Sequence, residues 1–462
     1  MKVALIQPYF DSHIIVPPLG LGYLASALRE HGHSVIIIDA LAKALPPERL
    51  VEFLKKEAPD LIGMTVYSTY YSQARDLINL IKGSLPDTPV VVGGPHVSAL
   101  PNFSLSNSRA DFAITGEGEQ PLCLLADTIR DGRAEFAYIP GIYYKDNNSS
   151  IIKGAASDFA ENLDDLKWPA WDLLGLSKYP AAPHGAFYKR FPVAPIITTR
   201  GCVYDCQFCA SKVIWSQKLR KRSSRNVVDE MEHLVRNYKV REFHIEDDNF
   251  TFYRDHAYQI CEEIIKRDMD VVWACPNGVR IDALDEGLLR VMKKSGCYLL
   301  AFGIESGSQM ILDRMTKRLS LGIISDKLEL VKKSGIETWG FFIIGLPGET
   351  EITVQETIAL AKKLPLDRAQ FCRFAPLPGT SIFIEWAKDR DLSEIDWPNL
   401  NYSGKGVYNT EGLSSQRLAF LQKQAFREFY LRPLILIKIL TKIRLRQIKW
   451  LIKRFKAYIF TN

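Results

Sequence analysis

The chain has eight cysteines, and the single stretch in which they cluster provides three metal ligands where a closed metal site needs four. Three of the eight cysteines fall within TTRGCVYDCQFCAS (residues 198–211), as Cys202, Cys206 and Cys209. A closed zinc site and a ferredoxin-type cluster each take four protein ligands, so this trio leaves one ligand position open. The other cysteines occur singly in apolar segments, which favours reduced, buried thiols over a disulfide framework.

Long apolar runs are missing as well. No run reaches the roughly 18 apolar residues of a membrane-spanning helix, and the opening MKVALIQPYF is too short in apolar content for a signal peptide. We therefore expect a cytoplasmic protein. With 462 residues, 47% of them hydrophobic, and no low-complexity segment, the chain is long enough for two or three domains with proper cores.

Acidic residues are absent from the last 34 positions. Residues 429–462, the basic tail, contain nine Lys and Arg and no Asp or Glu, whereas the preceding residues carry 50 basic and 53 acidic side chains. The net charge of +6 therefore belongs to the tail and does not indicate nucleic-acid affinity for the whole chain. Helical periodicity predicts a cationic amphipathic helix there, suited to the cytoplasmic membrane face, to docking on the protein, or to nucleic acid.

Residues 1–139 alternate apolar strand patterns with helical patterns. We expect strands over residues 3–7, 35–39, 60–66, 89–94 and 111–116. Strands that alternate with helices predict an α/β fold with a doubly wound, Rossmann-like parallel sheet, whose ligands lie at the carboxyl ends of the strands.

Residues 140–194 read as a linker, with a hairpin followed by an extended connector rich in proline and aromatics. Residues 195–385 then repeat a strand-and-helix rhythm through six strands, which predicts a partial (βα)6 barrel with its chemistry at the strand carboxyl ends. Residues 386–462 form the expected C-terminal helical region. Cys275 and Cys372 lie in predicted barrel strands, where they are buried or face the interior.

Several ordered motifs resemble one family. The cysteine loop is followed by EDDNFT, GIESGSQ, IGLPGET and PLPGTS, a set similar to the radical S-adenosylmethionine (SAM) superfamily over residues 195–385. With the N-terminal GLGYLASALREHGHSV, VVGGPH and TGEGE, residues 1–385 resemble the cobalamin-binding-domain radical SAM proteins, which include class B methyltransferases.

The resemblance implies a use for the open ligand position. A [4Fe-4S] cluster held by three thiolates leaves one iron free to chelate SAM, whose cleavage gives a 5′-deoxyadenosyl radical. An electron donor such as flavodoxin or ferredoxin is then required. The residues that the resemblance places at SAM are Phe208, Glu246, Asp247, Glu305, Ser306, Ile343 and Gly345.

For the N-terminal domain the resemblance implies cobalamin. The residues at the matching positions are Ser68, Thr69, Gly93, Gly94, Thr115, Gly116 and Glu117. The loop after the first strand reads Asp11-Ser12-His13 and lacks the glycine of a histidine-ligating motif, so we expect His13 to be a polar loop residue. A domain that holds no cobalamin is the alternative.

The sequence as a whole predicts a radical SAM enzyme that methylates an unactivated carbon of a small or lipid-like substrate with the help of cobalamin. Two alternatives remain at this point. One is a radical SAM cyclase, ring-rearranging or C–C coupling enzyme with an empty N-terminal domain. The other is a zinc-stabilised binding module in which a distant side chain such as His184 completes the cysteine trio.

Overall fold

The chain forms two compact units in a computed structural model that describes residues 1–12, 14–179, 188–401, 408–410 and 412–440. The first unit combines Met1–Tyr179, Phe208–Arg220 and Leu377–Pro398. The second combines Pro180–Gln207, Lys221–Pro376 and Asn399–Asn462. Each unit therefore contains segments that are distant in sequence, and each is described separately.

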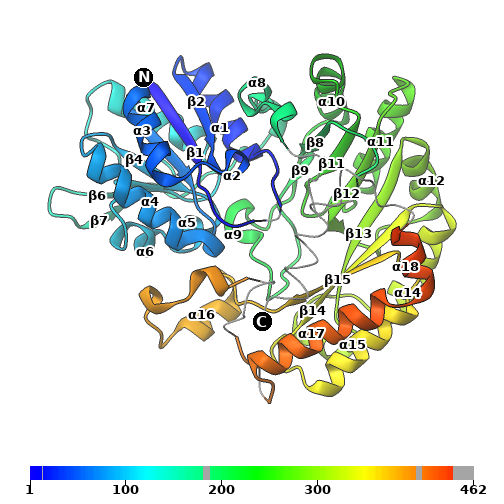
Figure 1. The fold of residues 1–462 in the computed structure, drawn as a ribbon. Helices are drawn as coiled ribbons and strands as arrows, with labels where there is room; N and C mark the ends of the chain where they lie inside the picture. Colours follow the sequence, from blue (N-terminus) through cyan, green and yellow to red (C-terminus); the bar gives the residue numbers. More distant parts are fainter. Residues whose placement is uncertain (13, 180–187, 402–407, 411, 441–462) are drawn as a thin grey trace. The chain divides into compact units, whose positions relative to one another are not determined.

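A seven-stranded sheet organises the first unit, in the order β2-β1-β3-β4-β5-β6-β7 (Figure 1, blue to cyan). The first five strands are parallel, and β6 and β7 add to the edge as an antiparallel hairpin. The strand bounds are β1 (Lys2–Gln7), β2 (Ser34–Asp39), β3 (Leu61–Thr65), β4 (Val90–Gly93), β5 (Phe112–Ile114), β6 (Ile142–Lys145) and β7 (Ile151–Lys153).

Helices cover both faces of this sheet. Its helices are α1 (Leu19–Glu30), α2 (Ala40–Lys43), α3 (Pro47–Glu57), α4 (Tyr71–Ser84), α5 (Pro95–Ala99), α6 (Pro101–Ser106), α7 (Glu119–Arg130), α8 (Trp171–Leu174), α9 (Lys212–Trp215) and α16 (Ser381–Ala387). Apolar residues of α1 and α7 join Val3 and Leu5 of β1 in one core. Ala4 and Ile6 point to the opposite face and are also fully buried, as a doubly wound sheet requires.

The predicted linker makes specific contacts within the first unit. Its hairpin extends the sheet as β6 and β7, and the following residues pack on α1. A Cβ at Gly22 would lie 2.8 Å from side-chain atoms of Pro169 and Leu174, so glycine permits this close approach. The domain boundaries expected at residues 139, 194 and 385 stay predictions. The hairpin pairs with the first sheet and the connector packs on α1, because the apolar residues of both segments are buried by these contacts.

The second unit contains a six-stranded parallel sheet in the order β15-β14-β13-β12-β11-β8 (Figure 1, green to yellow). Its strands are β8 (Val193–Ile196), β11 (Glu242–Ile245), β12 (Val272–Val279), β13 (Cys297–Glu305), β14 (Glu337–Ile344) and β15 (Arg368–Arg373), and the two-residue strand β9 (Thr199–Arg200) follows β8 outside this sheet. Six successive parallel strands confirm the predicted partial barrel.

Five of the helices described in the second unit begin at side-chain caps. The helices described in this unit are α10 (Ser224–Tyr238), α11 (Arg254–Lys266), α12 (Glu286–Lys294), α13 (Gln309–Arg314), α14 (Leu321–Lys333), α15 (Glu351–Lys363), α17 (Ser415–Tyr430) and α18 (Pro433–Leu440). Ser223, Asp285, Ser320, Thr350 and Ser414 each accept a hydrogen bond from a first-turn backbone N–H. Only the start of the helix predicted in the basic tail is described, as α18, and residues 441–462 lie outside the described residues.

Candidate functional site

The cysteine loop follows β8 and β9, and a buried carboxylate holds its entrance. Asp247, at the carboxyl end of β11, accepts hydrogen bonds from Thr198 N (2.6 Å), Thr198 Oγ1 (2.5 Å) and Thr199 Oγ1 (2.9 Å). Burial raises the pKa of Asp247 to about 6. The Asp247 carboxylate is therefore engaged by hydrogen bonds from Thr198 and Thr199, which lead into the cysteine loop. A direct contact of Asp247 with SAM stays a prediction.

The three loop cysteines are reduced and partly accessible. Cys202, Cys206 and Cys209 are not in disulfides and are of intermediate exposure, and Gly201 precedes them with a φ of 100°. Burial raises the pKa of the Cys202 and Cys206 thiols. Three accessible thiols on one short loop suit a cluster that takes three protein thiolates.

Nothing in the described part of the chain resembles a closed single-ion site. Among those residues, no group of three or more His, Cys, Asp or Glu side chains is arranged to hold a metal ion. The zinc alternative completes the cysteine trio with a fourth, distant side chain. His184, the distant ligand considered for it, lies outside the described residues.

A buried ion pair lies beside the cysteine loop. Glu305 ends β13 with a φ of 68°, an uncommon conformation for a residue with a side chain, and its Oε1 accepts a hydrogen bond from Lys317 Nζ at 2.8 Å. The charges of Lys317 and Glu305 both act on the Cys206 thiol, the lysine lowering its pKa and the glutamate raising it. Glu305 was predicted at this site, whereas Lys317 carried no sequence signal.

Arg280 connects three loops at the same sheet edge. Its guanidinium lies 3.9 Å from the ring centroid of Tyr204 in the cysteine loop and makes two hydrogen bonds to Asp282 (3.0 and 2.7 Å). It also donates to the carbonyl oxygens of Lys317 (2.8 Å) and Arg318 (2.9 Å). A cation held over an aromatic ring and by four oxygens stiffens the surroundings of the cysteines.

The remaining predicted SAM residues differ in accessibility. Glu246 is half-buried and accepts a hydrogen bond from Asn277 Nδ2 at 2.6 Å, and Phe208 and Ile343 are also half-buried. Ser306 is fully buried, and its hydroxyl contacts Thr357 Oγ1 (3.3 Å). Ser306 therefore has a packing role in this structure, and its predicted contact with SAM remains untested.

The turn after β14 is organised by Glu349. Its Oε2 accepts hydrogen bonds from the backbone N–H groups of Gly345 (2.6 Å) and Leu346 (3.0 Å). Burial raises the pKa of Glu349 to about 7. Gly345 has a φ of 93°, and a Cβ there would lie 2.9 Å from Leu418 of α17, so only glycine fits without strain.

In the first unit, the predicted cobalamin residues come together at the carboxyl ends of β3, β4 and β5. These strands are neighbours, and the loops after them are joined by hydrogen bonds from Val66 N to Gly93 O (2.8 Å) and from Gly116 N to Ser98 Oγ (3.0 Å). Gly94 has a φ of 96°, and a Cβ there would lie 2.9 Å from Thr65 Oγ1. The gathering fits the predicted ligand-binding edge of a doubly wound sheet.

His96, which the sequence analysis did not single out, is fully buried next to these loops. Its Nδ1 shares a hydrogen bond with Ser68 Oγ at 3.0 Å, and its Nε2 has no hydrogen-bond partner. Burial lowers the pKa of His96 to about 3, so the imidazole is neutral. Its ring stacks on Tyr71, 4.2 Å between centroids, and meets the edge of Trp397. An unused imidazole nitrogen beside Ser68 is a polar group that a bound ligand could satisfy.

Three other residues of the predicted cobalamin site either have hydrogen-bond partners within the protein or are only partly buried. Thr115 donates its hydroxyl to the carbonyl of Gly141 (3.0 Å), and Thr69 is half-buried in the short helix η1 (Ser68–Tyr70). Both carboxylate oxygens of Glu117 are engaged by Arg220, at 2.8 and 2.9 Å. The Glu117 carboxylate is therefore engaged within the protein, and its predicted contact with cobalamin stays a prediction. His13 lies outside the described residues.

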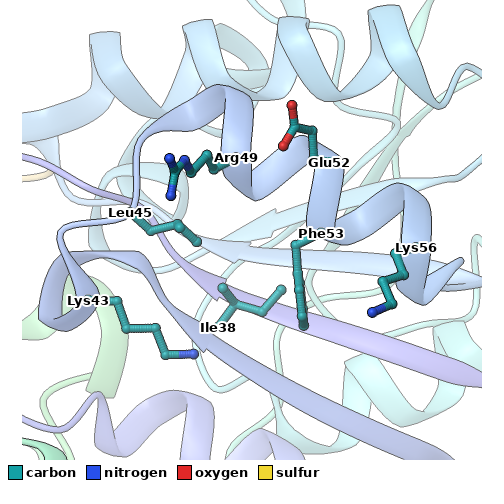
Figure 2. A pocket seen from close by; sticks show the side chains of 7 residues that line it. All are labelled: Ile38, Lys43, Leu45, Arg49, Glu52, Phe53 and Lys56. Atoms are coloured by element: carbon teal, nitrogen blue, oxygen red, sulfur yellow. The ribbon is translucent and has the colours of Figure 1, made fainter.

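A surface hollow of about 650 Å³ lies elsewhere in the first unit, beside the edge strand β2. In Figure 2 the ring of Phe53 and the side chain of Ile38 form its apolar floor, with Lys43 and Lys56 at either side. Its lining contains none of the predicted site residues. In the barrel, Cys275 is buried in β12 and Cys372 is partly exposed in β15.

Comparison with known proteins assigns both regions. The B12 binding domain family matches residues 11–126, and the radical SAM superfamily matches residues 196–361. A protein of Pyrococcus horikoshii described as an uncharacterized methyltransferase is 33% identical over 445 residues, covering 95% of this chain and 94% of the relative.

Two further relatives carry different activities. The cytidylyl-2-hydroxyethylphosphonate methyltransferase of Streptomyces wedmorensis is 29% identical and covers 90% of this chain and 86% of its own length. The anaerobic magnesium-protoporphyrin IX monomethyl ester cyclase of Rubrivivax gelatinosus is also 29% identical, over 99% of this chain and 82% of its own.

The fold is shared with solved structures. OxsB, a cobalamin-dependent SAM radical enzyme solved with aqua-cobalamin and SAM, superposes with a TM-score of 0.75 at 17% identity over 99% of this chain and 71% of its own. The methyltransferase TsrM from Kitasatospora setae, solved with cobalamin and a [4Fe-4S] cluster, gives 0.70 at 22% identity over 84% and 74%. With both domains matched and 33% identity across nearly its whole length, the chain belongs to the cobalamin-binding-domain radical SAM family, whose enzymes use a [4Fe-4S] cluster, SAM and cobalamin.

Proposed function

We propose that the protein transfers a methyl group from SAM to an unactivated carbon of a small or lipid-like substrate. The observation that carries this proposal is the presence, on one chain, of an accessible three-cysteine loop and of a doubly wound domain whose predicted ligand residues gather at one sheet edge. When bound, the cluster supplies the electron that cleaves SAM, and cobalamin supplies a carrier for the methyl group. Two of the relatives described above are methyltransferases.

The chain's own residues have distinct tasks in this proposal. Cys202, Cys206 and Cys209 provide the three thiolates, and Asp247 positions the start of their loop. Glu305 and Lys317 place a fixed pair of opposite charges beside Cys206, suited to the amino and carboxylate groups of SAM.

At the other SAM positions the support comes from backbone geometry and exposure. The turn around Gly345 offers backbone groups at the end of β14, and Glu349 holds that turn. Phe208, Glu246 and Ile343 are half-buried and so remain accessible for contact with the ligand.

The proposal that the first unit binds cobalamin is supported by residues that follow the ends of β3 and β4. Gly93 and Gly94 allow a ligand to pass close to the backbone, and Ser68 and Thr69 offer hydroxyl groups after β3. The unused Nε2 of His96 adds a buried polar group beside Ser68.

The test is product analysis under anaerobic conditions. The reconstituted protein is incubated with SAM, a reductant and hydroxocobalamin, and mass spectrometry follows 5′-deoxyadenosine and S-adenosylhomocysteine. We expect both products. Because one relative is a cyclase, 5′-deoxyadenosine without S-adenosylhomocysteine would favour the cyclase alternative. Metal analysis gives about four irons per chain for the enzyme and about one zinc for a binding module.

The same experiment identifies the electron donor. We propose a flavodoxin or ferredoxin, because cleavage of SAM through a low-potential cluster needs a single-electron donor. Replacement of the chemical reductant by reduced flavodoxin or ferredoxin should maintain 5′-deoxyadenosine formation, and loss of it with both proteins would contradict the assignment.

We further propose that α18 brings the protein to an anionic membrane surface. Leu434 and Ile437 of this helix are 76% and 58% exposed, while Ile435 and the ion pair of Lys438 with Asp367 (3.0 Å) hold it on the second unit. The sequence that follows, residues 441–462, carries seven Lys and Arg and no acid. Apolar side chains next to cationic ones are the combination that binds anionic lipid headgroups. None of the helices in the described residues is long and apolar enough to span a bilayer.

Vesicle sedimentation tests this surface. We expect the protein to sediment with phosphatidylglycerol vesicles and not with phosphatidylcholine vesicles, and raised salt to weaken binding. Leu434→Asp should reduce the bound fraction at least about fivefold. Ile384→Asp is the matched control, because Ile384 is also apolar and 66% exposed but lies in the first unit. Equal loss in both variants would contradict the proposal.

A further inference from the structure

The segment that carries the third cysteine belongs to the first unit. Residues Phe208–Arg220 follow the cysteine loop directly, yet they group with the cobalamin-binding domain, whereas the residues on either side group with the barrel. Cys209 is the second residue of this segment, and Cys206 is the last cysteine before it. The position of one cluster ligand thus depends on contacts made within the first unit.

The middle of the segment is packed on the loops predicted to hold cobalamin. Its helix α9 contacts α5, which begins immediately after Gly93 and Gly94. Gly379, with a φ of 86°, lies against Val213 of α9 so closely that an added Cβ would overlap that side chain. A Cβ added there would also lie 3.4 Å from Ala99 of α5. The helix is therefore enclosed by parts of the first unit.

A buried ion pair holds the end of the segment. The guanidinium of Arg220 donates to both carboxylate oxygens of Glu117, at 2.8 and 2.9 Å, and the two side chains are only 3% and 5% exposed. Arg220 also donates to the carbonyl oxygen of Ala160 (2.8 Å), and Glu117 accepts from the N–H of Ala160 (2.9 Å). A bidentate pair without access to water is geometrically specific, and loss of either partner leaves a buried charge.

We propose that the Glu117–Arg220 pair couples cobalamin binding to cluster binding. Glu117 lies in the loop TGEGE that closes the predicted cobalamin edge, and Arg220 closes the segment that contains Cys209. Cobalamin that orders the loop also orders, through this pair, the segment that supplies the third thiolate. Both residues are positioning residues, since neither carboxylate nor guanidinium is free to contact the bound groups. The inference rests on the proposed function, because it requires both groups to bind.

The coupling is reciprocal and can be measured from either side. If the cluster tightens hydroxocobalamin binding by some factor, cobalamin must tighten cluster binding by the same factor. We expect a factor of about 10, inside the usual range of coupling between two sites. The factor is measured as the affinity of the full-length protein for hydroxocobalamin, by absorbance, with and without the reconstituted cluster, and slower iron release to bathophenanthroline with hydroxocobalamin bound shows the reciprocal effect in direction.

Arg220→Met and Glu117→Gln should each reduce the coupling factor to about 1–2, and Arg220→Lys should retain part of it because the charge remains. Arg222→Met is the matched control. Arg222 is two residues away and makes an equally buried ion pair with Glu230 (2.6 Å, 4% and 1% exposed), but that pair lies in the second unit. The control should lose stability and keep the coupling.

Each outcome has a definite meaning. Coupling that disappears in Arg220→Met and persists in Arg222→Met supports the proposal. A factor of one in the wild-type protein with both groups bound overturns the coupling alone, as does equal loss in the two arginine variants. Glu117→Gln provides the same comparison if Arg220→Met does not fold. A protein that binds neither hydroxocobalamin nor iron overturns the proposed function, and the coupling with it.

Discussion

Substitution of Glu349 by glutamine should make the stability of the protein depend less on pH. The carboxylate is fully buried in the turn after β14, and burial raises its pKa from 4.5 to about 7, against the opposing effect of the N–H groups of Gly345 and Leu346. Because the folded-state pKa lies above the unfolded value, folding favours the protonated form. The stability that this group contributes is therefore complete below pH 4.5 and is lost as the pH rises through about 7.

The size of the effect follows from the two pKa values. At about 1.4 kcal/mol for each pH unit between them, ionisation of Glu349 lowers the free energy of unfolding by up to about 3 kcal/mol. Glutamine keeps a carbonyl oxygen that can accept both backbone hydrogen bonds, and it stays neutral. The Glu349→Gln variant should therefore exceed the wild type by no more than about 1 kcal/mol near pH 5 and by about 3 kcal/mol near pH 8.

Urea unfolding of both proteins at a series of pH values between about 5 and 8 measures this difference. Glu351→Gln is the matched control, because Glu351 is an exposed residue two positions away whose pKa is lowered by its hydrogen bonds with Arg417. The control should show no trend over this range. A difference for Glu349→Gln that is constant with pH, or that falls as the pH rises, would show that the N–H donors keep the carboxylate ionised and would refute the reasoning.

Three further substitutions test the site. Lys317→Met leaves the Glu305 carboxylate buried without its cation and should lower the free energy of unfolding by about 3–5 kcal/mol, measured by urea titration; an unchanged midpoint would mean that the pair adds little. Gly345→Ala places a Cβ 2.9 Å from Leu418 at a positive φ and should cost about 1–3 kcal/mol, part of which Leu418→Ala recovers. Asp247→Ala frees the entrance of the cysteine loop and should speed iron release to a chelator about tenfold, whereas release at the wild-type rate would contradict its positioning role.

Most strands could be predicted from the sequence because their signals are local. Apolar runs such as residues 3–7 and 89–94 correspond to β1 and β4, since a strand buried on both faces needs nearly every side chain to be apolar. The resemblance named Ser68, Gly94 and Gly116, and because parallel strands present their carboxyl ends at one edge, the loops that carry them lie together.

The partners of the charged residues could not be predicted in this way. Nothing near Lys317 or Arg220 in the sequence marks them as members of buried ion pairs, because Glu305 and Glu117 lie 12 and 103 residues away. The burial of Ser306 against Thr357 could not be predicted either, because it depends on how α15 packs, and the assignment of Ser306 to SAM stays a prediction.

The sequence by itself determined the two α/β regions, because each depends on periodicity along a short stretch of chain, and it predicted the three-cysteine loop and the ligand-binding edge. Only the tertiary structure decided that the segment after Cys206 packs with the cobalamin-binding domain, and that Glu117 meets Arg220 and not solvent. Such contacts form when folding brings distant parts of the chain together. A buried charge needs an oppositely charged partner, and that partner can come from any part of the chain that lies beside it in the folded protein.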